Sequence, residues 1–171
     1  IYLHPDNSVQ NLTFNQLKKI YVGDIDNWKM VGGIDTLIQP VTRNPNSGTY
    51  LYFKDHILDA EEYGDNSLII PTTREIVKYV EQNINAIGYG GMGYKGIVIH
   101  AKIDGVEPTE NNVRNDTYPI IRYLHFISFS FMIIRLFDEI CAMMHTLDRI
   151  FAQTISVIFH PIGMVFYMFM Y

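Results

Sequence analysis

Residues 41–49 read Val41-Thr42-Arg43-Asn44-Pro45-Asn46-Ser47-Gly48-Thr49, and they lie between two different sequence patterns. Residues 37–42, which include Ile38 and Val41, predict a strand, because β-branched residues suit a pleated sheet. Residues 50–58 carry a helical pattern, and the helix is expected to begin near Ser47. The segment therefore predicts a strand, a turn and a helix in that order, which is typical of an α/β domain.

The turn itself is rich in hydrogen-bond donors. A helix that begins near Ser47 leaves its first backbone N–H groups without intrahelical partners and carries a partial positive charge at that end. Gly48 allows a close backbone approach, while Ser47 and Thr49 add hydroxyl groups. Arg43 can offer a planar fork to two oxygens. These four residues predict an oxyanion-binding loop.

The same residues also have a purely structural interpretation. Ser-Gly-Thr before a helix often serves only as an N-cap with a turn glycine, and a nearby arginine is often a solvated surface residue. The loop is not a Walker A motif, because no Gly-Lys-Ser/Thr follows it. From the loop alone, both interpretations remain open.

Capped helices and short apolar runs surround this segment. Thr13 with Gln16 predicts one helix that ends at Gly23, and Thr72 with Glu75 predicts a second. The remaining strand candidates are residues 86–89, 96–103 and 119–126. This alternation favours an α/β architecture. Trp28 is expected to be a packing residue.

Composition excludes several classes of protein. The chain has 171 residues, a net charge of −5, 48% hydrophobic residues and one cysteine, as expected for an ordinary globular domain. The lone Cys141 excludes a disulfide scaffold. The 13 Lys and Arg against 18 Asp and Glu make nucleic acid an unsuitable partner.

No metal, cofactor or catalytic site is predicted. The histidines lack metal-binding spacing. The glycine-rich residues 88–93 do not match a dinucleotide-binding loop, because no helical pattern follows them, and we interpret them as a loop on the side of the hinge. Ser47 as a nucleophile would need a G-x-S-x-G frame and His/Asp partners, which the sequence does not supply.

Both ends of the chain differ from its centre. The chain starts at Ile1 within a strand-like run, which we interpret as part of a longer protein. Residues 131–151 predict an amphipathic helix, and residues 150–171 contain no Asp, Glu, Lys or Arg over the length of a bilayer span. Three interpretations of this apolar end stay open: a packed helix, a membrane-associated tail, and an aberrant sequence such as a shifted reading frame.

Blocks of sequence in a fixed order resemble the substrate-binding proteins of high-affinity phosphate ABC transporters. The blocks are Asn11-Leu12-Thr13 with Gln16-Leu17; Asn27-Trp28 with Gly32-Gly33; Arg43 with Ser47-Gly48-Thr49; Ala86-Ile87-Gly88-Tyr89; Asp104-Gly105-Val106 with Pro108; and Tyr118-Pro119 with Arg122. Any one block is weak, but their common order is specific.

This resemblance implies a type II periplasmic-binding-protein fold, an α/β clamshell of which the chain supplies mainly one lobe, with a mixed sheet flanked by helices. It implies that residues 1–97 are the second lobe with the anion loop, that 98–126 are return strands towards the first lobe, and that 127–171 are an apolar helical tail. The implied function is to bind inorganic phosphate at the periplasmic or extracellular face of the cytoplasmic membrane and deliver it to the permease subunits. The implied ligands are Arg43, Ser47, Gly48 and Thr49.

The sequence departs from the family pattern in two respects. Pro45 stands where the family often has an acidic residue that orients the arginine. The first lobe, which supplies more donors and a carboxylate for the phosphate proton, precedes the equivalent of Ile1. Other oxyanions such as sulfate, molybdate or tungstate therefore stay open as ligands, as does a degenerate or membrane-associated fragment with a vestigial site. The chain alone is expected to bind phosphate weakly.

Overall fold

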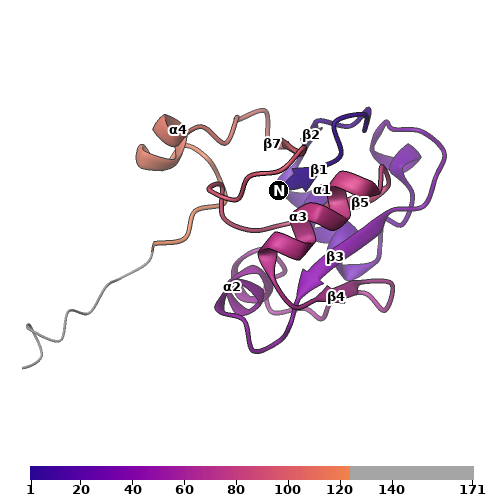
Figure 1. Ribbon diagram of the computed structural model, residues 1–171, viewed down its shortest axis with the longest axis horizontal. Helices are drawn as coiled ribbons and strands as arrows, with labels where there is room; N and C mark the ends of the chain where they lie inside the picture. The colour runs from indigo at the N-terminus through magenta and orange to yellow at the C-terminus, as the bar shows by residue number, and fades with distance from the viewer. Residues whose placement is uncertain (124–171) are drawn as a thin grey trace, which may run out of the picture. The chain divides into compact units, whose positions relative to one another are not determined.

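The computed structural model describes residues 1–123, and all of these except Tyr123 belong to one compact unit. Its main sheet has the strand order β4-β3-β5-β1-β6 (Figure 1). These strands are β1 (Tyr2–Leu3), β3 (Gln39–Arg43), β4 (Leu68–Ile70), β5 (Ala86–Gly88) and β6 (Ile99–His100). A second, two-stranded sheet pairs β2 (Asn11–Leu12) with β7 (Lys102–Ile103).

The helices connect and cover these strands. They are α1 (Phe14–Val22), the 3-10 helix η1 (Trp28–Val31), α2 (Gly48–His56), α3 (Thr73–Gln82) and α4 (Glu110–Arg114). Strand β3 is parallel to both β4 and β5, with α2 leading from β3 to β4 and α3 from β4 to β5. Strand β1 is antiparallel to β5 and β6. The predicted mixed α/β sheet with flanking helices is confirmed.

Local sequence signals place α1 and α3 correctly. The Thr13 hydroxyl accepts from the Gln16 N–H, and Gly23 ends α1 in the left-handed conformation at φ 96°. The Thr72 hydroxyl accepts from the Glu75 N–H in the same way at the start of α3. Each capping box satisfies backbone donors that would otherwise be left unpaired.

The sheet separates two hydrophobic clusters, because neighbouring side chains in a strand point to opposite faces. Leu3 and Ile87 contribute to the larger cluster, while Tyr2 and Ala86 contribute to the smaller one. Helix α3 packs on the smaller cluster through its buried residues Ile76, Val77 and Val80. The larger cluster includes side chains from α1 and α2. The prediction for Trp28 is confirmed: it is 1% exposed, and its Nε1 donates to the Asn85 carbonyl at 3.1 Å.

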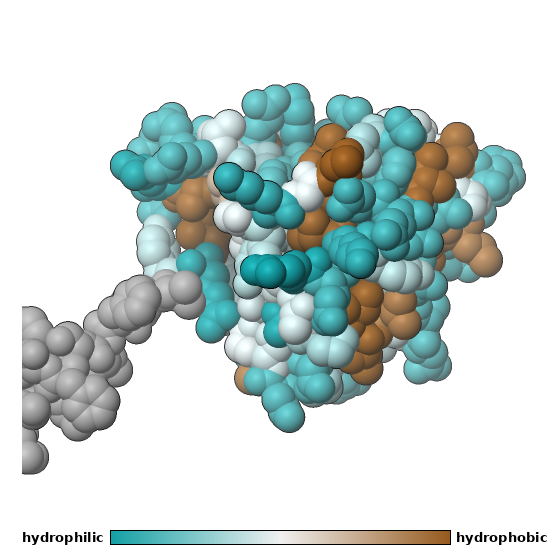
Figure 2. Space-filling view, in the orientation of Figure 1, coloured by the Kyte–Doolittle hydropathy of each residue, from teal (hydrophilic) through white to brown (hydrophobic). Residues whose placement is uncertain are grey.

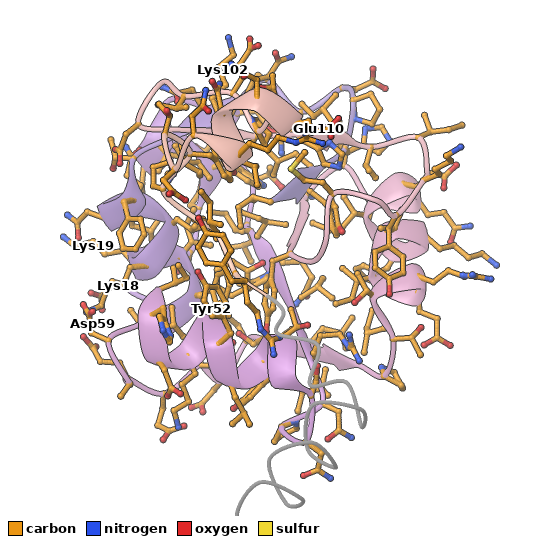
Figure 3. The ribbon with its side chains drawn as sticks, turned by 90° about the vertical axis from the view of Figure 1, so that its left-hand side faces the viewer. Lys18, Lys19, Tyr52, Asp59, Lys102 and Glu110 are labelled. Atoms are coloured by element: carbon orange, nitrogen blue, oxygen red, sulfur yellow. The ribbon has the colours of Figure 1, made fainter. Side chains whose placement is uncertain are left out.

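Surface charges pair between neighbouring segments. The Lys18 ammonium on α1 lies 2.8 Å from the Asp59 carboxylate and 2.7 Å from that of Glu61 (Figure 3). Because both carboxylates are exposed, such pairs contribute little to stability. Figure 2 shows a largely hydrophilic face with separate apolar patches. The exposed large hydrophobic side chains include Met30, Ile34 and Leu37.

Two strand predictions are wrong in detail. Residues 96–103 form two short strands instead of one, because the chain passes from one sheet to the other. The Ala101 N–H still donates to Ile1 in the main sheet, whereas the Lys102 N–H donates to Gln10. Residues 119–123 form no strand, and residues 124–126 of the predicted strand lie outside the described residues. Pro119 has no N–H to donate to a neighbouring strand, and the Ile121 carbonyl is bound by a side chain of α2.

The predicted helix over residues 131–151 and the apolar residues 150–171 lie outside the described residues. Among residues 1–123, no helix is both long and apolar enough to cross a bilayer. The division of the chain into 1–97, 98–126 and 127–171 stays a prediction.

Candidate anion-binding site

The candidate site lies where β3 and β4 end and the helices that follow them begin. Arg43 is the last residue of β3 and pairs in register with Ile70, the last residue of β4. Helix α2 begins five residues after Arg43, and α3 begins three residues after Ile70. Both helices thus present their N-termini at the carboxyl edge of the parallel strands, which is where α/β sheets bind ligands. The arrowhead of β3 in Figure 1 marks this edge.

The predicted loop forms an ordered turn. The Asn44 carbonyl accepts from the Ser47 N–H at 2.9 Å, and the Asn44 side chain accepts from the Asn46 N–H at 3.0 Å. Ser47 is the N-cap of α2, and its Oγ accepts from the Thr49 N–H at 3.2 Å. The Ser47 hydroxyl proton remains available to a ligand. Within residues 1–123, the Gly48 N–H and the Thr49 hydroxyl donate no hydrogen bond, so they are available as well.

Arg43 is held from the side of α3. Its Nε donates to the Pro71 carbonyl at 3.1 Å, and its Nη1 donates to the Thr73 hydroxyl at 2.6 Å. Both acceptors are neutral, and none of the ion pairs in the described part of the chain involves Arg43. A guanidinium has five N–H donors, so three remain for a ligand. Neither partner could be predicted from the loop sequence, because both follow a different strand, β4.

A second guanidinium, which was not among the predicted ligands, lies against the start of α2. A Cβ atom on Gly48 would lie 2.9 Å from Nη2 and 3.4 Å from Nη1 of Arg122. The Arg122 Cζ is 5.9 Å from the centroid of the Tyr52 ring, and the Tyr52 hydroxyl donates to the Ile121 carbonyl at 2.5 Å. Tyr52, labelled in Figure 3, thus holds both Arg122 and the backbone before it. A larger residue at Gly48 would therefore displace the Arg122 guanidinium from the start of α2.

The positive charge of Arg122 is unusual at the N-terminus of a helix. The N-terminus of a helix carries a partial positive charge and favours anions, so a cation there is unfavourable by about 0.3–1 kcal/mol. The first turn of α2 has no acidic side chain, and Arg122 forms no ion pair within the described residues. A bound anion would compensate both the partial positive charge at the start of α2 and the positive charge of the guanidinium.

Buried tyrosines form the floor beneath this loop. The hydroxyls of Thr42 and Tyr89 lie 2.7 Å apart, and those of Tyr63 and Tyr89 lie 2.8 Å apart. Phe53 of α2 stacks on Tyr89 with the ring centroids 3.9 Å apart. The Tyr21 hydroxyl donates to the Ile87 carbonyl at 3.1 Å. This network joins the end of β3 and the buried face of α2, so it fixes the support of the loop.

The buried tyrosines predict that the fold loses stability at alkaline pH. Burial raises the pKa of Tyr89 and raises that of Tyr21 well above its usual value. Burial of the neutral phenols stabilises the fold fully at pH values below the unfolded-state pKa of about 10. As the pH rises above this value, the free energy of unfolding falls by up to about 1.4 kcal/mol per pH unit for each phenol. Urea unfolding at pH 8, 10 and 11 should show this decline, and Tyr21→Phe should make it shallower. Leu51→Ala, at a side chain that is 49% exposed and does not titrate, should leave the slope unchanged.

Clusters of three or more metal-ligating side chains are absent from residues 1–123. None of the histidines or carboxylates described there forms a hydrogen bond with Ser47. The groups described at the start of α2 are hydrogen-bond donors, which is the chemistry of an anion-binding site.

Comparison with known proteins gives consistent results. A family model described as "PBP superfamily domain" matches residues 1–133. The chain is 35% identical over 144 residues to the phosphate-binding protein PstS of Pseudomonas aeruginosa, which covers 73% of this chain and 45% of that protein. It is also 35% identical over 125 residues to PstS of Bacillus subtilis, covering 72% of this chain and 41% of that protein. The chain thus spans less than half the length of these relatives.

Solved structures show the same relationship. A phosphate ABC transporter substrate-binding protein from Clostridium perfringens, crystallised with bound phosphate, superposes with a TM-score of 0.67 at 41% identity. The match covers 70% of this chain and 50% of that one. PstS from Borrelia burgdorferi superposes with a TM-score of 0.66 at 27% identity, covering 70% of this chain and 52% of that one.

Proposed function

The chain belongs to the PBP superfamily, and on that premise we propose that it is the lobe of a phosphate-binding protein that carries the anion loop. Arg43, Ser47, Gly48 and Thr49 are the proposed ligands, and Arg122 is a fifth. The Clostridium perfringens relative, at 41% identity, was solved with phosphate bound. The proposed role of the whole protein is to capture phosphate outside the cytoplasmic membrane and pass it to an ABC permease.

The observation that carries this proposal is the convergence of unneutralised donors at one sheet edge. Two guanidinium groups and the start of α2 lie there, and no carboxylate of the described residues pairs with either arginine. Such donors stabilise a tetrahedral oxyanion through charge-assisted hydrogen bonds. A site made only of donors holds its ligand without transforming it, and we therefore propose binding without catalysis.

Affinity is expected to be weak in the chain alone. The relatives are more than twice as long as the matched region, and clamshell closure in them would add donors from the other lobe. An anion that stays partly hydrated gains less from each donor, because water screens and competes for the same oxygens. Sulfate, molybdate and tungstate remain candidate ligands, since a donor-lined loop alone does not distinguish a protonated oxyanion from an unprotonated one.

Titration of the ¹⁵N-labelled chain with phosphate, followed by amide NMR, tests the proposal. We expect the amide signals of Ser47, Gly48 and Thr49 to shift in a saturable manner, with sulfate at equal ionic strength as the comparison. Calorimetry should give a dissociation constant well above about 1 μM. No saturable shift at these amides would refute phosphate binding at this loop. Phosphate-selective binding below about 1 μM by this chain alone would refute the argument from a half-site.

A further inference from the structure

We propose that Thr73 is a positioning residue for Arg43, which it orients towards the anion without neutralising its charge. The inference rests on the proposed function, because it concerns the same site. Thr73 is the first residue of α3 and is 4% exposed. Its hydroxyl accepts from Nη1 of Arg43 at 2.6 Å, while the Pro71 carbonyl accepts from Nε at 3.1 Å. Two acceptors at two different nitrogens fix the plane of the guanidinium.

Helix α3 does not need this hydroxyl for its own cap. The cap is the preceding residue Thr72, whose hydroxyl accepts from the Glu75 N–H at 3.2 Å, and Glu75 in turn accepts from the Thr72 N–H at 3.1 Å. A buried hydroxyl is costly unless it is hydrogen-bonded, and the bond that satisfies Thr73 is the one to Arg43. The Thr73 hydroxyl therefore serves the arginine and not the helix.

The backbone around Thr73 holds its side chain in one orientation. A Cβ atom on Gly90 would lie only 2.3 Å from the Thr73 methyl carbon, so that methyl group packs directly on the glycine backbone. The Tyr2 hydroxyl donates to the Gly91 carbonyl at 2.6 Å and fixes the same loop. Threonine in a helix has two accessible χ1 rotamers. Packing of the methyl group against Gly90 selects the one that directs the hydroxyl to Arg43.

Because the Thr73 hydroxyl is neutral, it leaves the positive charge of Arg43 available to a ligand. A carboxylate beside Arg43 would orient it too, but would also cancel its charge and repel an anion. The position in the loop that the sequence analysis marked for such a residue holds Pro45. With Thr73 and the Pro71 carbonyl as partners, the full positive charge of Arg43 is directed to the ligand. Thr73 thus orients the guanidinium of Arg43 without compensating its charge.

The test uses phosphate titrations of three variants of the full chain. Thr73→Val keeps the size and branching of the side chain but removes the hydroxyl, and should weaken phosphate binding about tenfold, as expected when a bond to a charged group is lost. Thr73→Ser restores the hydroxyl and should bind within about threefold of the wild type. Thr73→Ala removes the hydroxyl with less bulk, and provides the same comparison if Thr73→Val does not fold.

A second measurement distinguishes positioning from general stability. In an Arg43→Lys background, which should still bind measurably, Thr73→Val should cause a much smaller loss of binding than in the wild type, because its effect passes through the guanidinium. The Arg43 Nε–H signal should also move in Thr73→Val and return in Thr73→Ser. Wild-type affinity in both Thr73→Val and Thr73→Ala would overturn the inference while leaving phosphate binding in place. A wild-type chain that does not bind phosphate at all would overturn the proposed function, and this inference with it.

Discussion

Arg43→Ala should remove the saturable phosphate-dependent shift of the Gly48 amide. The substitution deletes a charged donor whose three remaining N–H groups face no partner within residues 1–123. Each hydrogen bond to a charged group contributes about 1.5–3 kcal/mol, so loss of two such bonds weakens binding by a factor of about 100 or more. Because the wild-type chain already binds phosphate weakly, a loss of this size makes binding by the variant too weak to measure in the titration.

Two variants serve as controls for this result. Arg43→Lys keeps the charge but lacks the planar fork, and should bind with an affinity between those of the wild type and the alanine variant. His56→Ala changes the last residue of α2, at the opposite end of the helix from Gly48, and should bind as the wild type does. Equal losses in Arg43→Ala and His56→Ala would contradict the assignment of the site. A folded Arg43→Ala chain that still binds phosphate normally would contradict it as well.

The sequence predicts those parts of the fold whose signals are local. A capping box involves residues three positions apart, and the structure confirms both of the predicted boxes. The passage from β3 through the turn to α2 was predicted for the same reason, since a strand pattern, a turn and a helical pattern follow one another within residues 37–58. Strands β2 and β4 were missed because runs of two and three residues are too short to display a periodicity.

The candidate site shows the same division between local and distant signals. The loop residues Ser47 and Gly48 could be identified from one turn. Arg43 could be identified as a donor, but its orientation depends on Thr73, which is 30 positions away in the sequence and is brought close by the register of β3 with β4. Arg122 was visible only as part of a family motif, because its contact with Gly48 depends on the packing of a later segment on α2. Composition and spacing cannot specify contacts of this kind.

Phe53→Ala should have the largest effect on stability, and it links the core to the site. Phe53 is 2% exposed, stacks on Tyr89 at 3.9 Å and meets the edge of Tyr21 at 4.8 Å between ring centroids. Truncating a buried phenylalanine to alanine lowers the free energy of unfolding by about 3–5 kcal/mol, through lost burial and the cavity that remains. Urea unfolding of the variant should show a loss of this size.

The matched control lies on the same helix. Leu51→Ala changes a side chain that is 49% exposed, and should alter the free energy of unfolding by less than about 1 kcal/mol. Phe53 is the fully buried side chain of α2, and Ser47 and Gly48 are fixed to the start of that helix. Phe53→Ala should therefore also reduce the phosphate-dependent shift at Gly48, although Phe53 is not a proposed ligand. A Phe53→Ala chain as stable as Leu51→Ala would show that α2, and the anion loop with it, is held by something other than this aromatic contact.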